Sequence, residues 1–153
     1  MVSPVIQNYL LAIILRFRMH RYVIIADIEK LFRQIRVHPS DYPLQRILWR
    51  SSSSQPLRTF ELTTVTYGTA SAPYLATKCL ERLSEDGSND FPLASLVLGK
   101  DFYMDDMLTG VDDEEEGNEL CRQLLQLLQS AGLSLRKWTS NSSAILSQMG
   151  QNS

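Results

Sequence analysis

Two adjacent aspartates, Asp105 and Asp106, interrupt the otherwise apolar segment 102–108 (FYMDDML). A carboxylate that leaves water without gaining a partner is costly, so these side chains need hydrogen bonds, a cation or contact with solvent. Because Asp is common in turns, a solvated hairpin tip explains a bare Asp-Asp pair without any ligand. The flanking Tyr103 and Met104, and a third carboxylate after another apolar run, favour a metal site instead.

The third carboxylate is Asp27, which directly follows the apolar, partly β-branched run Tyr22–Ala26 and lies 78 residues before Asp105. This run predicts a buried strand that carries Asp27 at its C-terminal end. Aspartates that strands bring together can hold two divalent cations, which stabilise the attacking and leaving oxygens of an in-line phosphoryl transfer. Oxygen ligands and substrate phosphates suit Mg²⁺, so we expect two Mg²⁺ ions, with Mn²⁺ as a substitute.

Other metal-binding side chains do not form a competing site. His20 and His38 lie 18 residues apart without partner cysteines, and His38 is interpreted as a loop residue. Cys79 and Cys121 are too few for a disulfide framework or a four-cysteine metal site. We expect both to be buried thiols.

The first half of the chain predicts one helix and one hairpin besides the strand before Asp27. Apolar spacing indicates an amphipathic helix over 4–19, begun by a Ser-Pro pair. Two strands near 45–50 and 57–65 flank the polar segment 51–56, which predicts a turn between them.

In the second half, a helix is expected from Ala72 to the turn-rich segment 86–90. Residues 97–111 are typical of two strands that meet at Asp105 and Asp106. Helix, strand, hairpin, helix, hairpin and helix then follow one another. This order predicts an α+β fold with helices layered on an antiparallel sheet, in a single domain of 153 residues.

The last expected helix spans 112–131, with Gly132 just past its end. Its acidic opening, 112–116, is interpreted as a favourable charge at the positive end of the helix dipole, without a role in chemistry. One apolar stripe runs along the helix, formed by Leu120, Leu124, Leu127 and Leu128.

Charge is distributed unevenly along the chain. Residues 1–50 hold eight Lys and Arg against three acidic residues, a formal charge of +5, whereas 51–100 carry −1 and 101–153 carry −6. A basic first third suits a polyanion such as nucleic acid, although ordinary surface charge explains such a segment equally simply.

No run of apolar residues is long enough to predict a membrane span. The short apolar stretch 9–15 lacks the preceding positive charge and the cleavage site of a signal peptide. We therefore expect an intracellular, cytoplasmic protein without a cleaved leader or a membrane partner.

Four segments, in order, resemble the catalytic motifs of reverse transcriptases, which polymerise DNA on an RNA template. They are Ala26–Phe32 (ADIEKLF), Thr66–Pro73 (TYGTASAP), Tyr103–Asp106 (YMDD) and Leu133–Lys137 (LSLRK). The sequences at 16–18 and 136–141 are similar to those of the reverse transcriptases of BEL/Pao retrotransposons. The ordered set spans about residues 10–145, so it is far more specific than a lone YMDD.

This resemblance implies a polymerase palm and assigns the site residues. Asp27 and Asp105 would contact the two metals most directly, with Asp106 in a supporting role. Ile28 would offer its backbone carbonyl to the nucleotide-bound metal. Lys137 matches a basic residue that protonates pyrophosphate, although a surface lysine is an equal interpretation.

The remaining family positions concern the substrates. Phe32 matches the ring beneath the incoming sugar, where it would exclude a 2′-hydroxyl, although a Phe at this spacing can also fill the core. Tyr67 and Gly68 would border the substrate, where Gly permits close backbone approach. Tyr103 and Met104 would lie beside the primer terminus, and both also suit strand packing.

By this resemblance, residues 1–25 would form a helix at the edge of fingers and palm, and 26–145 would form the palm with all four motifs. The substrates would be an RNA or DNA template with its primer and deoxynucleoside triphosphates. We expect a part of a longer polyprotein that functions in a retrotransposon particle, with fingers, thumb and ribonuclease H segments elsewhere. The 153 residues alone would then extend a primer poorly.

Two alternatives stay open. A catalytically inactive remnant, or a domesticated nucleic-acid-binding module, would keep the fold and a basic face. A metal-dependent nuclease would use similar carboxylates, but would not need Phe32 or the Tyr67-Gly68 pair.

Overall fold

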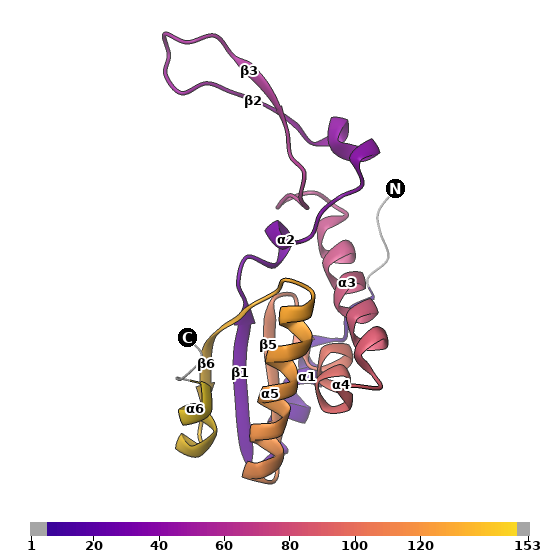
Figure 1. The fold of residues 1–153 in the computed structure, drawn as a ribbon, viewed down its shortest axis with the longest axis vertical. Helices are drawn as coiled ribbons and strands as arrows, with labels where there is room; N and C mark the ends of the chain where they lie inside the picture. Colours follow the sequence, from indigo (N-terminus) through magenta and orange to yellow (C-terminus); the bar gives the residue numbers. More distant parts are fainter. Residues whose placement is uncertain (1–5, 150–153) are drawn as a thin grey trace.

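A four-stranded antiparallel sheet lies at the centre of the computed structural model, which describes residues 6–149. The order of its strands is β4–β5–β1–β6. Their bounds are Tyr22–Ile28 for β1, Phe102–Tyr103 for β4, Asp106–Val111 for β5 and Leu135–Ser140 for β6. The central pair therefore joins segments far apart in the sequence (Figure 1). The α+β class with an antiparallel sheet packed against helices is confirmed.

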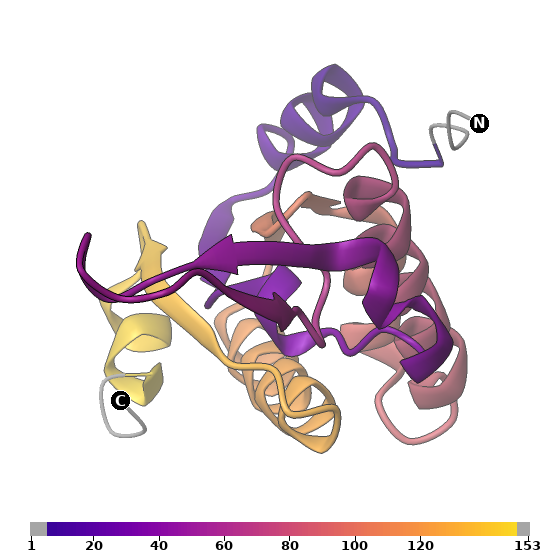
Figure 2. The ribbon, with the colours of Figure 1, turned by 90° about the horizontal axis from the view of Figure 1, so that it is seen from above.

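Helices surround the sheet. In Figure 2, α1 and α5 lie at opposite sides of the view with strands of the sheet between them. Helix α6 packs against α5 and β6, and α4 packs between α3 and α5. Their bounds are Leu10–Phe17 for α1, Ala72–Gly87 for α3, Pro92–Lys100 for α4, Glu114–Ser130 for α5 and Ser143–Met149 for α6.

Strand β1 alternates as a half-buried strand should. Ile24, Ala26 and Ile28 are buried, whereas Ile25 and Asp27 face the other side and are half-buried. The strand expected over 22–26 is confirmed and extends two residues further. Asp27 thus lies inside the hydrogen-bonded ladder, so its backbone position is held from both sides.

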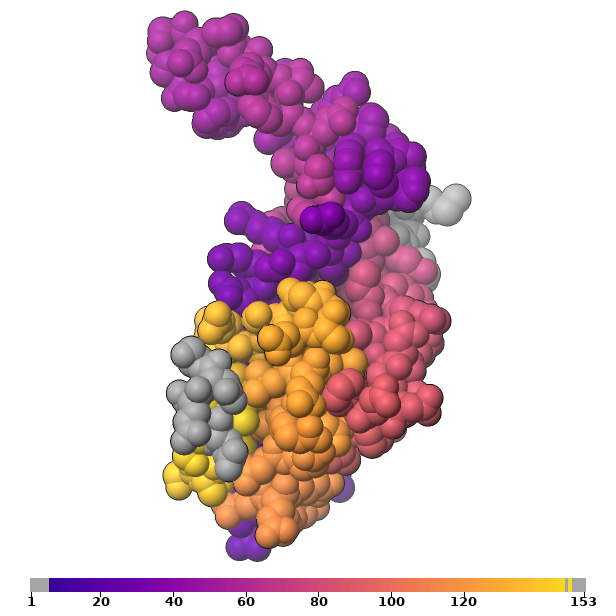
Figure 3. Space-filling model, viewed as in Figure 1, coloured from indigo at the N-terminus to yellow at the C-terminus, as the bar shows by residue number. Residues whose placement is uncertain are grey.

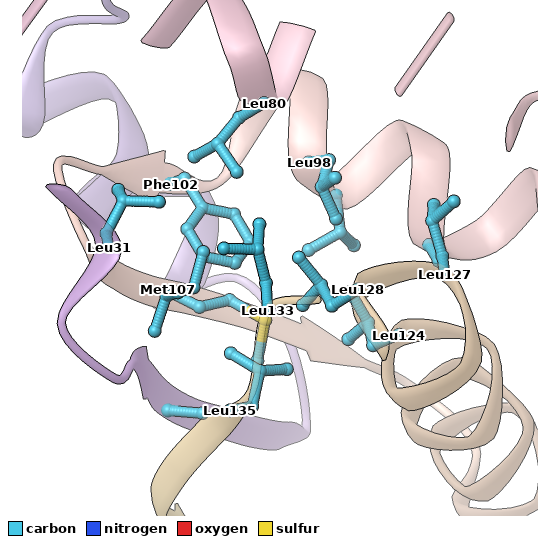
Figure 4. Packing of buried hydrophobic residues seen from close by; sticks show 14 of the residues in the cluster. Leu31, Leu80, Leu98, Phe102, Met107, Leu124, Leu127, Leu128, Leu133 and Leu135 are labelled. Carbon is cyan, nitrogen blue, oxygen red and sulfur yellow. The ribbon is translucent and has the colours of Figure 1, made fainter. Parts of the chain in front are cut away.

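The leucine stripe of α5 is confirmed as core. Leu124 and Leu128 are fully buried, and Figure 4 shows them facing Leu98 of α4, with Phe102 and Met107 of the sheet nearby. The acidic opening of α5 is also as expected. The Asp113 carboxylate caps the helix by accepting from the backbone N–H groups of Glu115 (2.8 Å) and Glu116 (3.2 Å).

A long hairpin projects away from the sheet, as Figures 1 and 3 show. It consists of β2 (Arg46–Trp49) and β3 (Arg58–Glu61), preceded by the 3₁₀-helix η1 (Pro39–Gln45). All residues of both strands are exposed. The predicted hairpin is confirmed, but β3 ends at Glu61 rather than residue 65.

Of the two strands expected within 97–111, the first is confined to Phe102–Tyr103 (β4), and its expected start is wrong because Pro92–Lys100 forms α4. A short buried apolar run fits a helix or a strand equally well by pattern. Two features favour the helix: Pro92 in its first turn, and the Gln123 side chain of α5, whose Oε1 accepts from Leu93 N–H at 3.0 Å. The second feature depends on tertiary contact and cannot be read locally.

Other differences are smaller. The helix expected over 4–19 begins at Leu10 and ends at Phe17, and its predicted Ser-Pro start lies outside the described residues. The short helix α2 (Leu31–Gln34), strand β6 and helix α6 were not predicted.

The two cysteines differ from one another. Cys121 is buried as expected, and burial raises the pKa of its thiol to about 12. Cys79 is exposed on α3, so the expectation of a buried thiol there is wrong. Within residues 6–149, no helix combines the length and apolar character that crossing a membrane requires.

Truncating the core stripe should cost far more stability than truncating an exposed leucine. Leu124→Ala removes a fully buried side chain and should lower the free energy of unfolding by about 2–5 kcal/mol. Leu96→Ala in α4, where the side chain is 55% exposed, is the control and should have little effect. Chemical denaturation of both variants measures the difference; equal losses would contradict this description of the core.

Candidate active site

The backbone ladder brings the three aspartates together. Asp27 of β1 pairs with Asp106, the first residue of β5. The next residue, Ile28, donates its N–H to the backbone carbonyl of Asp105 at 2.8 Å. The two carboxylate-bearing segments are thus joined by main-chain hydrogen bonds, although 78 residues separate them in sequence.

Asp105 lies in a two-residue turn between β4 and β5. The other turn residue, Met104, has φ of +59°, a left-handed conformation that tight hairpins normally assign to glycine. The two strands therefore meet at Met104 and Asp105, one residue earlier than the expected Asp105 and Asp106. Asp106 belongs to the ladder and is exposed.

The Asp27 carboxylate is largely buried. Its side chain is 17% exposed, and its Oδ2 accepts from the Lys137 ammonium at 3.1 Å. The second oxygen, Oδ1, is buried and has no hydrogen-bond donor among the described residues. A buried carboxylate oxygen without a donor is unusual, and a water or a cation is the kind of partner that would satisfy it.

The carboxylates repel one another. Burial raises the pKa of Asp106 above its usual value, the negative charges of Asp105 and Asp27 raise it further, and the Lys137 ammonium opposes them. A cation beside the cluster would therefore favour the charged form of Asp106. Among residues 6–149, no three acidic, histidine or cysteine side chains converge in a ready metal-binding arrangement. Their oxygens are nevertheless the donors that Mg²⁺ prefers.

A bulge in β6 directs Lys137 toward Asp27. Ile25 pairs with Thr139 but Asp27 pairs with Arg136, so β6 contains one residue more than β1 across this step. Lys137 lies in the extra stretch with φ of +55°. Bulges commonly re-aim a side chain in this way, so the ammonium reaches a carboxylate on the neighbouring strand.

Left-handed backbone is concentrated around the aspartates. Among the described residues, the non-glycine positions with positive φ are Lys30, Met104 and Lys137. Each lies within three residues of Asp27 or Asp105, or touches Asp27 through its side chain. Such strained positions are typical of functional sites, where the surrounding structure maintains them.

The first two predicted motifs meet through their rings. Phe32 of α2 is 8% exposed, and its ring centroid lies 5.0 Å from that of Tyr67 in an edge-to-face arrangement. Tyr67 is 54% exposed and lies in the loop before α3. Beside it, Gly68 has φ of +80° and open space where a Cβ would be.

The remaining predicted residues surround the turn and the end of β1. Ile28 is fully buried, Tyr103 of β4 is 36% exposed, and Met104 is partly buried against the core. The structure therefore brings Ile28, Tyr103, Met104 and the aspartates to one end of the sheet. Phe32 and Tyr67 lie beyond that end, after β1.

A second ion-pair cluster next to the aspartates was not predicted. Glu29 accepts from Arg136 at 3.2 Å and pairs with Lys30 at 3.0 Å. Lys30 first, and then Arg136, hold the pKa of Glu29 below its usual value. No local pattern indicated this cluster, because Glu29 lies in the turn after β1 and meets Arg136 only where β6 pairs with that strand.

Comparison with known proteins agrees with these motifs. A search among curated proteins finds no significant relative. Residues 5–138 match the family described as reverse transcriptase (RNA-dependent DNA polymerase). The match covers most of the chain and all three aspartates, and the family implies template, primer and deoxynucleotide substrates. The chain belongs to the reverse transcriptase family.

Proposed function

We propose that this domain transfers nucleotides to a primer at a two-metal site formed by Asp27, Asp105 and Asp106. The observation that carries the proposal is the register, in which Asp27 faces Asp106 while Ile28 binds the Asp105 carbonyl at 2.8 Å. Main-chain hydrogen bonds thus hold two aspartate-bearing segments together before any substrate arrives. Such preorganisation is what a phosphoryl-transfer site requires.

The donor set fits divalent cations. Among the described residues no donor reaches the buried Oδ1 of Asp27. Burial and then the charges of Asp105 and Asp27 raise the pKa of Asp106, so added positive charge would be stabilised. Asp27 and Asp105 would hold two Mg²⁺ ions, or Mn²⁺ in their place, with Asp106 in support. When bound, such ions make the primer 3′-hydroxyl more acidic and neutralise the leaving pyrophosphate.

Other residues position the substrates in this proposal. The Ile28 carbonyl lies beside the nucleotide phosphates. The Phe32 ring lies beneath the incoming sugar, supported by its contact with Tyr67, and Gly68 leaves room for close approach. Tyr103 and Met104 border the primer terminus, and the Lys137 ammonium supplies a proton to pyrophosphate.

The projecting hairpin is suited to a single-stranded template. Trp49 and Phe60 are partly exposed with ring centroids 6.1 Å apart, and the Arg58 guanidinium lies 5.5 Å from the Phe60 ring. Exposed rings with adjacent arginines are the usual platform for stacked bases beside phosphates. We assign the template strand ahead of the primer terminus to this surface.

We further propose a BEL/Pao lineage, with residues 1–25 at the edge of fingers and palm and 26–145 as the palm from which the hairpin projects. Supporting this are the resembling segments on both sides of the motifs, at 16–18 and 136–141. A retrotransposon particle would be the setting, with fingers, thumb and ribonuclease H segments in the same polyprotein. Continuous protease, ribonuclease H and integrase reading frames beside this one would support the lineage.

An inactive remnant or a nucleic-acid-binding module is the alternative. Primer extension on an RNA template by the complete reading frame decides between them. Extension that requires Mg²⁺ supports the polymerase, whereas tight nucleic-acid binding without extension supports the alternative. Cleavage of the template without extension would indicate the nuclease.

Asp105→Asn should abolish polymerisation without unfolding the domain. The change removes a negative charge and keeps the shape, so the extension rate should fall by about a hundredfold or more. Asp112→Asn, at an exposed position beside His20, is the matched control and should extend normally. Rates come from primer extension and folding from circular dichroism; near-normal extension by Asp105→Asn would refute the two-metal proposal.

Phe32→Val should separate the sugar-selecting role from packing. If the ring excludes a 2′-hydroxyl, the ratio of kcat/KM for ribonucleotide over deoxynucleotide should rise by about tenfold to a few hundredfold. Leu31→Val, one residue earlier and also buried, is the control for a simple cavity. Should Phe32→Val lose about 2–4 kcal/mol of stability with an unchanged ratio, the ring is a packing residue.

Trp49→Leu should weaken template binding while the fold stays intact. A stacked base contributes about 1–3 kcal/mol, so the dissociation constant for a primer with a single-stranded template overhang should rise accordingly. Leu57→Ala, an exposed apolar residue beside β3, is the control. Fluorescence anisotropy measures both; equal affinity for Trp49→Leu and wild type would exclude this surface from template binding.

A further inference from the structure

Lys137 forms an exposed ion pair with Asp27, although its backbone has an unfavourable positive φ. Its side chain is 81% exposed, and Nζ lies 3.1 Å from Asp27 Oδ2. An exposed lysine pair contributes little to stability, because solvent screens it and the long side chain loses freedom. The ammonium is therefore easily displaced.

The backbone nevertheless places it there. Lys137 has φ of +55° in the bulge of β6, where most side-chain-bearing residues are disfavoured. In a regular ladder, β6 would pair with β1 residue for residue, and no position would need a positive φ. A strained position that supports only a weak contact suggests that the contact serves the site rather than the fold.

The partner of Lys137 is still incompletely satisfied. Asp27 Oδ1 is buried without a hydrogen-bond donor among the described residues, so the ammonium contacts one oxygen of the carboxylate and leaves the other without a partner. Arg136, the next residue along β6, is already engaged with Glu29 at 3.2 Å. Within residues 6–149, Lys137 is thus the cation that directly contacts the aspartate cluster, and its charge is the one that a metal ion would replace.

We propose that Lys137 is an exchangeable counter-ion for Asp27: its ammonium occupies the carboxylate while no divalent cation is bound and leaves when one enters. This inference rests on the proposed function, because it assumes that Asp27 is a metal ligand. Binding is then an exchange of one cation for another, without any covalent step. The exchange lowers the apparent metal affinity of the empty site and frees the ammonium to meet an anionic substrate.

The test measures Mn²⁺ binding to the 153-residue chain by electron paramagnetic resonance, without substrates. Lys137→Met keeps an unbranched side chain of similar length and removes its charge, so Mn²⁺ should bind about tenfold more tightly or better, as expected for one charge beside a carboxylate. Lys137→Gly removes the ammonium and also tolerates positive φ, so it should show the same gain free of backbone strain. Lys137→Arg keeps the charge and should stay near wild type.

Arg136→Met is the matched control, since it removes one positive charge from the neighbouring residue. It should change Mn²⁺ affinity far less than Lys137→Met; an equal gain would show a general charge effect and overturn the exchange. Asp27→Asn separates the two proposals. If it abolishes Mn²⁺ binding while both Lys137→Met and Lys137→Gly match wild type, the exchange is wrong and the metal site stands. If Asp27→Asn also binds normally, both proposals fail.

Discussion

The antiparallel pairing of β1 with β5 is the constraint on which the site depends. It sets Asp27 against Asp106 and lets Ile28 reach the Asp105 carbonyl. Side chains alternate along a strand, so a slip of one residue would turn Asp27 into the core and Ile28 out of it. Three fully buried side chains, Ile24, Ile28 and Met107, make that slip unfavourable. Packing on one face of the sheet thus positions the charges on the other.

Those charges impose a second constraint. Burial first, and then the charges of Asp105 and Asp27, raise the pKa of Asp106, so a nearby cation would stabilise the charged cluster. Lys137 supplies this positive charge from within the chain, from a bulge in β6 where its φ is positive and most residues are disfavoured.

The structure also divides rigid from accessible parts. The helices α3, α4 and α5 bury a continuous core behind the sheet, whereas the hairpin β2–β3 has exposed residues throughout. Catalytic geometry requires rigid support, and binding to an extended polyanion requires exposed rings and arginines. Each part has the composition that its proposed role needs.

Local patterns in the sequence determined the strand before Asp27, the leucine stripe of α5, the hairpin and the four ordered motifs, because each depends on periodicity or on neighbouring residues. They did not determine α4, because its apolar run fits a strand as well as a helix. The helix is favoured by Gln123 of α5, whose side chain accepts from the Leu93 N–H. Nor did they determine the pairing of Glu29 with Arg136 or of Lys137 with Asp27, which join segments more than 100 residues apart. The bulge that aims Lys137 exists only where β6 meets β1. Tertiary structure alone decided these features, because a positive φ or a shared cap is stabilised by the partner and not by the local chain.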